Sequence, residues 1–152
     1  MSNRAPDWLR QAEADLQHAE LARNNADYEW SCFAAQQAAE KALKALFISL
    51  HGDPWGHSVL ALLEGLPEAA KRLVNEDLLN SARALDKHYI PTRYPNGFAE
   101  GAPVDYYTKR DAEDSLRHAK SILAFCETEI RKPQRTSDAG EDDGTTNSGE
   151  AS

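Results

Sequence analysis

The residues best suited to chemistry lie in one loop and at the start of the segment that follows it. Arg93, Tyr94 and Pro95 place a guanidinium group, an aromatic ring and a rigid backbone side by side. Lys109 and Arg110 fall in the first turn of the last expected helix, whose free amides can receive a phosphate. Aromatic rings beside an arginine can stack a base while the arginine holds its phosphate. Arg93, Tyr94, Lys109 and Arg110 are therefore candidate ligands for a nucleotide or RNA phosphate.

A purely structural interpretation of the same loop remains open. Tyr94 and Pro95 could pack the loop onto the body of the protein, while Arg93 pairs with a nearby carboxylate such as Asp105. Further aromatic side chains surround the loop in sequence, namely Tyr89, Phe98, Tyr106 and Tyr107. The residue types alone do not decide between ligand binding and packing.

Other common kinds of catalytic site are not indicated. Cys32 and Cys126 fall far apart in expected helices, which favours two buried, reduced thiols over a disulfide. We expect no metal site and no cofactor, because the sequence has no zinc-type Cys/His spacing, glycine-rich phosphate loop or GxSxG elbow. His57 either caps the short helix that follows it or joins a site near the second helix, and a structural role is favoured.

Composition predicts one globular domain over residues 1–131 and a disordered acidic tail over residues 132–152. The 152-residue chain is 41% hydrophobic and 28% charged, with a net charge of −8. An acidic body argues against broad, non-specific binding of nucleic acid, although it allows a small basic site. The sequence shows no signal-peptide core and no apolar run long enough to cross a membrane, so we expect a cytoplasmic protein with no membrane association.

Helical periodicity of the apolar residues predicts an all-α fold. The expected elements are long helices over residues 6–25, 28–50, 68–88 and from 108 onward, with a short helix over residues 58–66. Ser58 is a candidate N-cap, Thr108 and Asp111 resemble a capping box, and a break is expected near Asn75. Residues 91–105 contain three prolines and two glycines and are expected to form a long loop. The pattern predicts an up-and-down bundle of four to five helices.

The second expected helix combines many alanines with a group of polar residues. Gln36, Gln37, Glu40 and Lys41 could bind a partner or ligand, or satisfy one another. Glu40 and Lys44 lie four residues apart and are expected to pair on the surface.

Several segments together resemble the HEPN family, the helical domains often encoded beside minimal nucleotidyltransferases. The segments are Trp8, Ala12 and Asp15-Leu16; Cys32-Phe33 with the run from Gln36 to Ala45; Gly56-His57-Ser58; and Arg93-Tyr94-Pro95, Tyr106-Tyr107-Thr108 and Asp111-Ala112. The resemblance spans about residues 6–130, and its Arg-Tyr-Pro loop is similar to that of the HEPN domain of the chaperone sacsin. It implies a helical bundle that forms a homodimer and pairs with a minimal nucleotidyltransferase in a toxin–antitoxin-like system.

The resemblance also implies two activities. Many HEPN members are metal-independent ribonucleases with an arginine four to six residues before a histidine, a spacing that Arg83 and His88 match. The arginine would stabilise charge on the phosphate and the histidine would move a proton. Other members bind nucleotides without cleaving RNA. In the alternative, structural interpretation, Arg83 and Lys87 form a solvated helix face and a cationic His88 ends the helix favourably.

Three hypotheses follow for this chain. In the first, the Arg93 loop and the start of the last helix bind a nucleotide or RNA phosphate without cleavage. In the second, His88 with Arg83 or Arg93 forms a composite ribonuclease site at a dimer interface. In the third, the domain supplies only a surface for dimerisation and docking. The nucleotidyltransferase chemistry itself is not expected here, because the sequence lacks the Gly-Ser loop and paired aspartates of that fold.

Overall fold

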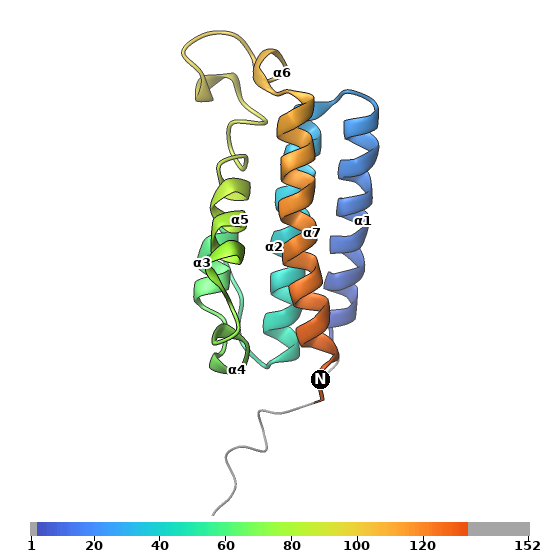
Figure 1. Cartoon of the computed structure of the whole chain (residues 1–152), viewed down its shortest axis with the longest axis vertical. Coiled ribbons are helices and arrows are strands. Elements are labelled where there is room, and N and C mark those ends of the chain that lie inside the picture. Colours follow the sequence, from blue (N-terminus) through green and yellow to red (C-terminus); the bar gives the residue numbers. More distant parts are fainter. Residues whose placement is uncertain (1–2, 134–152) are drawn as a thin grey trace, which may run out of the picture.

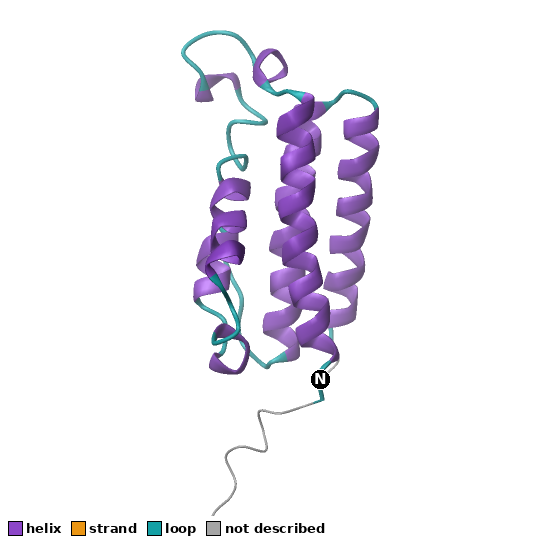
Figure 2. Cartoon of the chain, in the orientation of Figure 1, coloured by secondary structure: helices purple, strands orange, loops and turns teal. Residues whose placement is uncertain are grey.

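The computed structural model describes residues 3–133 and contains helices without strands over that range. The helices are α1 (Ala5–Asn24), α2 (Tyr28–Ser49), α3 (Val59–Glu64), α4 (Glu68–Lys71), α5 (Glu76–Asp86), the 3-10 turn η1 (Pro95–Gly97), α6 (Pro103–Tyr106) and α7 (Lys109–Arg131). The three long helices α1, α2 and α7 lie side by side, and α3, α4 and α5 flank them (Figures 1 and 2). The predicted all-helical bundle is therefore confirmed.

The long helices pack closely because small side chains line their contacts. Helix α2 packs most extensively against α1 and α7. Nine alanines on these helices are completely buried: Ala12, Ala19, Ala35, Ala38, Ala39, Ala42, Ala45, Ala112 and Ala119. Helix α1 runs antiparallel to α2, whereas α2 and α7 begin at the same end of the bundle, the upper end in Figure 1. This end also carries residues 87–107, so it gathers most of the candidate site residues.

Side-chain caps define the shorter helices. The hydroxyl of Ser58 accepts a hydrogen bond from the backbone N–H of Ala61, so the predicted cap of α3 is confirmed. The Asn75 side chain accepts from the Leu78 N–H and begins α5, which divides the expected helix over residues 68–88 into α4 and α5. The fourth long helix is consequently only 11 residues long.

Both hydrogen bonds of the capping box predicted for α7 are present. Thr108 accepts from the Asp111 N–H at 3.2 Å, and the Asp111 carboxylate accepts from the Thr108 N–H at 3.0 Å. Between α5 and α7 the chain is mainly loop, as expected, with the short η1 and α6 inside it.

Both cysteines are free and completely buried, which confirms the prediction of two reduced thiols. Burial raises the pKa of the Cys32 thiol to about 12 and also raises the pKa of Cys126, so neither thiol forms a reactive thiolate near neutral pH. Trp30 is half-exposed because it lies on the first turn of α2, at the end of the bundle.

The expected disordered tail, residues 132–152, lies outside the described residues apart from Lys132 and Pro133. The globular body over residues 5–131 forms one continuous bundle with a single large core cluster.

Candidate functional site

The turns that follow α5 are held by side chains that fold back onto the backbone. The buried Thr92 hydroxyl donates to the carbonyl oxygen of His88 at 2.7 Å. Arg93 donates from Nε and Nη2 to the carbonyl oxygen of Tyr89, at 2.9 and 2.6 Å. These bonds orient the Arg93 guanidinium group toward the upper part of α2.

Three aromatic rings surround the guanidinium group of Arg93. Its Cζ lies 4.4 Å from the ring centroid of Phe33 on α2, 4.7 Å from that of Tyr89 and 5.2 Å from that of Tyr94. Each is within the distance of a cation–π contact. We call these four residues the Arg93 cage. The cage was not predictable from sequence spacing, because Phe33 lies 60 residues before Arg93.

No carboxylate among residues 3–133 forms an ion pair with Arg93. The expected alternative partner, Asp105, instead accepts a hydrogen bond from the Ala102 N–H at 2.9 Å. The expectation of an Arg93–Asp105 pair is therefore wrong, because the short helix α6 uses this carboxylate at its own start. Within the described part of the chain, the Nη1 of Arg93 also has no hydrogen-bond partner, so one edge of the guanidinium group remains available.

Lys109 and Arg110 are exposed on the first turn of α7, at the same end of the bundle as the cage. None of the hydrogen bonds in the described chain links them to Arg93 or Tyr94. The capping box of α7 already occupies the N–H of Asp111 and places a carboxylate in the first turn. The two cations can therefore contribute charge at this end, while the helix amides contribute less than the sequence alone indicated.

His88 lies two residues beyond the end of α5 and is partly buried against Tyr107. Its Nδ1 lies 3.3 Å from the Tyr107 hydroxyl oxygen, and the two rings meet edge to face at 5.4 Å. Burial lowers the pKa of His88 and raises the pKa of Tyr107 to about 12. The expectation of a cationic His88 at a helix end is wrong, because desolvation favours the neutral imidazole.

Arg83 occupies a different environment from His88. Its Nη1 donates to the Glu76 carboxylate at 3.1 Å and to the Asn80 side-chain oxygen at 2.8 Å, both on the exposed side of α5. No described contact joins Arg83 to His88 within one chain, and each has its own partners.

The polar residues of α2 form a buried hydrogen-bond chain. Gln36 is completely buried and donates to the carbonyl oxygen of His57 at 2.8 Å and to Asp86 at 3.3 Å. Gln37 donates to the side-chain oxygens of Gln36 and Glu40, at 2.8 and 3.0 Å. Gln36, Gln37 and Glu40 therefore satisfy one another, which confirms one of the two sequence interpretations for these three residues. Lys41, the fourth residue of that group, instead pairs with Asp15 of α1.

Glu40 and Lys44 pair as predicted, at 3.1 Å, but in the interior and not on the surface. Glu40 is only 4% exposed. The same carboxylate contacts Nδ1 of His57 at 3.2 Å. The buried acid therefore holds the His57 side chain as well as the lysine.

His57 connects this hydrogen-bond chain to the cage. Its ring stacks on the Tyr89 ring at a centroid distance of 5.2 Å and an angle of 17°. No local sequence signal indicated this contact. The sequence predicted only that His57 either caps the short helix or joins a site near α2. His118 likewise has a partner that its sequence did not reveal, the Ser81 hydroxyl at 2.9 Å.

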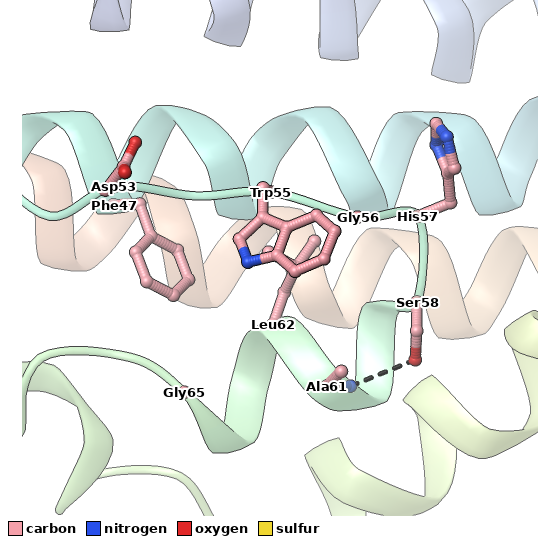
Figure 3. Close-up of a pocket in the computed structure, with 9 residues that line it drawn as sticks. All are labelled: Phe47, Asp53, Trp55, Gly56, His57, Ser58, Ala61, Leu62 and Gly65. Carbon is pink, nitrogen blue, oxygen red and sulfur yellow. Dashed lines mark hydrogen bonds between the residues drawn. The ribbon is translucent and has the colours of Figure 1, made fainter.

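A pocket of about 410 Å³ opens beside His57, between residues 53–58 and α3 (Figure 3). Its lining residues are Phe47, Asp53, Trp55, Gly56, His57, Ser58, Ala61, Leu62 and Gly65. Trp55 is 85% exposed, and no motif in the sequence marked it as a candidate.

The family of the chain follows from comparison with known proteins. The model of the HEPN domain family matches residues 5–129. The chain belongs to the HEPN family. The match covers the helices α1 to α7 almost completely and includes every candidate site residue named above.

Solved structures share this HEPN fold. A Thermus thermophilus protein of known crystal structure has 50% sequence identity and a TM-score of 0.81, covering 84% of this chain and 99% of that one. An archaeal HEPN homologue has 41% identity and a TM-score of 0.71, covering 86% and 100%. A HEPN domain protein from Thermotoga maritima has 34% identity and a TM-score of 0.63, covering 80% and 95%.

A curated relative carries a functional name. It is a protein of Methanocaldococcus jannaschii named "Putative toxin", 29% identical over 124 residues, which covers 76% of this chain and 81% of the relative.

In this HEPN domain, none of the described helices is long and apolar enough to cross a membrane. Residues 3–133 contain no group of three or more His, Cys, Asp or Glu side chains arranged to hold a metal ion.

Proposed function

We propose that this HEPN domain binds the phosphate of a nucleotide or RNA at the Arg93 cage, as the toxin-like member of a toxin–antitoxin-like pair. The observation that carries the proposal is an arginine held among three aromatic rings with no carboxylate partner among the described residues. The toxin-named relative supports the second half of the proposal.

The cage has the properties that phosphate recognition requires. A guanidinium group offers donors in a fixed plane, and the cage holds that plane before a ligand arrives. Tyr94 is 48% exposed, so one of its ring faces can stack a base. Lys109 and Arg110 are exposed at the same end and add attraction for an anion.

The proposal extends to the partners of the domain. The family resemblance supports a homodimer, a minimal nucleotidyltransferase partner and a cytoplasmic location. The Arg93-Tyr94-Pro95 loop supports placement in the subgroup that is similar to the sacsin HEPN domain. The acidic tail, residues 132–152, is proposed to lie outside the binding domain.

Binding of fluorescently labelled short RNA and of a mononucleotide tests the proposal by anisotropy. We expect Arg93→Ala to weaken both by about tenfold to one hundredfold, since hydrogen bonds to charged groups contribute about 1.5–3 kcal/mol. Arg72→Ala is the matched control, because Arg72 is exposed near α4 and far from the cage. Wild-type protein that binds neither ligand, or equal binding by both variants, would refute the proposal and leave a structural docking domain.

A second candidate function is metal-independent RNA cleavage, which the environment of His88 favours. Burial lowers the pKa of this imidazole and keeps it neutral, and a neutral imidazole can accept a proton from a ribose hydroxyl group. The arginine of this composite site would be Arg83 or Arg93. A second copy of the chain would complete the site at the dimer interface.

Cleavage by the purified protein in EDTA distinguishes this function from binding alone. The ribonuclease hypothesis requires activity that disappears in His88→Ala while fold and oligomeric state persist. Cleavage that survives His88→Ala argues against it. Loss of cleavage in Arg83→Ala or Arg93→Ala then identifies the arginine.

A further inference from the structure

The pocket beside Trp55 is lined mainly by apolar side chains. Figure 3 shows the Phe47, Trp55 and Leu62 side chains on one side of the 53–58 segment, with Asp53 and His57 directed to the other. Its volume of about 410 Å³ lies in the range of small-molecule sites. The largely exposed Trp55 indole offers a flat apolar face to solvent at the mouth of the pocket.

The charges around this pocket disfavour a phosphate within it. No lysine or arginine lines it, and the carboxylate of its one acidic lining residue, Asp53, is directed to the other side of the 53–58 segment. The buried Glu40 carboxylate lies 3.2 Å from Nδ1 of His57, but Lys44 pairs with it at 3.1 Å, so it adds no net negative charge to the pocket. A planar, neutral group that stacks on an aromatic ring is the complementary occupant, and an unpaired nucleobase is such a group.

The pocket adjoins the Arg93 cage through two stacked rings. The His57 ring lies 5.2 Å from the Tyr89 ring, and the Tyr89 ring lies 4.7 Å from Cζ of Arg93. The His57 ring and the guanidinium group are therefore at most about 10 Å apart. Because His57 is also one of the residues that line the pocket, a strand held at Arg93 by a phosphate can reach the pocket with a nearby part of the strand.

We propose that the Trp55 pocket is a base-binding subsite for single-stranded RNA. One phosphate lies at Arg93, and a base from an adjacent part of the strand stacks on the Trp55 indole. The inference rests on the proposed function of the cage and makes it more specific, because the ligand is then an oligonucleotide and not a mononucleotide. Single-stranded nucleic acid is commonly bound by this combination of cationic and aromatic side chains.

Anisotropy with a labelled adenosine hexanucleotide, and competition by AMP, tests the subsite in the 152-residue chain. Trp55→Ala is expected to weaken hexanucleotide binding by about tenfold, within the range for one stacked base, and to leave AMP binding unchanged. Trp55→Phe keeps an aromatic face and is expected to retain most of the affinity. Leu73→Ala, an exposed apolar position outside the pocket, is the matched control.

The remaining outcomes separate the subsite from the cage. If Arg93→Ala weakens both ligands while Trp55→Ala changes neither, the subsite is wrong and the function of the cage stands. If wild-type protein binds neither ligand, both proposals fail. If Trp55→Ala dissociates the dimer or a protein partner while RNA binding persists, the pocket is a protein-docking surface and the base subsite is refuted.

Discussion

The three long helices and the segment between α2 and α7 are stabilised in different ways. Helices α1, α2 and α7 pack through small apolar side chains, with the completely buried Ala38 and Ala119 as examples. Residues 50–107 contain only short helices. Hydrogen bonds donated by Gln36 and Arg93 and accepted by Asp86 hold this segment in place. The regular helices thus provide a rigid support, while the candidate chemistry lies in the segment that depends on specific polar contacts.

The largest expected effect comes from Glu40→Ala, which removes a buried ion pair of α2 and one of the contacts between these two regions. The variant leaves Lys44 largely buried without its carboxylate, since the Lys44 side chain is only 12% exposed. Removing one partner of a buried ion pair costs about 3–5 kcal/mol, and urea denaturation measures the loss. Glu64→Ala, at an exposed position of α3, is expected to change stability by less than about 0.5 kcal/mol. A Glu40→Ala loss below about 1 kcal/mol, smaller than the cost of stranding a buried charge, would show that the two regions are stabilised independently.

Overpacking the long helices should have the next largest effect. Ala119→Leu places extra methyl groups where the side chain is completely buried, and we expect a loss of about 1–3 kcal/mol. Ala124→Leu, on an exposed position of the same helix, is the control and should be nearly neutral. Equal denaturation midpoints for the two variants would mean that the alanine contacts are not tight.

Loss of a cap should have a smaller effect. Thr108→Ala removes the hydroxyl that accepts from the Asp111 N–H, and caps of this kind contribute about 1 kcal/mol. Thr128→Ala, on the same helix α7, lacks this role and tests for a general effect of the substitution. Thermal denaturation of both variants compares them directly, and a larger loss in Thr128→Ala would contradict the capping argument.

The smallest expected effect is a pH dependence from His88. Its pKa is lowered by burial, so the unfolded chain binds the proton more readily than the folded chain. His88 therefore contributes stability above its ordinary pKa of 6.5, and this contribution is lost as the pH falls from there toward its lowered folded value. Melting temperatures across this range should decline less in His88→Gln than in the wild type.

The melting temperature of His88→Gln should still decline somewhat as the pH falls, because burial also lowers the pKa of His118. In the double variant His88→Gln/His118→Gln, the melting temperature should depend even less on pH. Identical slopes in the wild type and in His88→Gln would show that His88 is solvated in the folded protein.

The sequence predicted those features that depend on neighbouring residues. Ser58 and Thr108 cap the helices that follow them, because the hydrogen bond spans only three residues. Helical periodicity is local in the same way, and along α5 Leu78, Ala82 and Leu85 are buried at helical spacing. Local signals of this kind are present in the chain before it folds.

The site was less predictable, because its contacts join residues distant in the sequence. Phe33 meets Arg93 across the bundle, and Tyr89 meets His57 between two loops. No rule of sequence spacing predicts either of these contacts. The sequence named the arginine and the tyrosines as chemically suitable, but the alternative carboxylate pair with Asp105 could be rejected only from the fold.

One carboxylate also determines how the candidate site should move. Asp86 ends α5 and accepts from the backbone N–H groups of Val59 and Leu60, 27 and 26 residues earlier. A six-residue helix such as α3 cannot persist alone in water. Its amides should therefore exchange their hydrogens only when the end of α5 detaches, so α3, the pocket and the turns leading to Arg93 open as one cooperative unit. Local unfolding of the candidate site would then be governed by a residue that never touches the ligand.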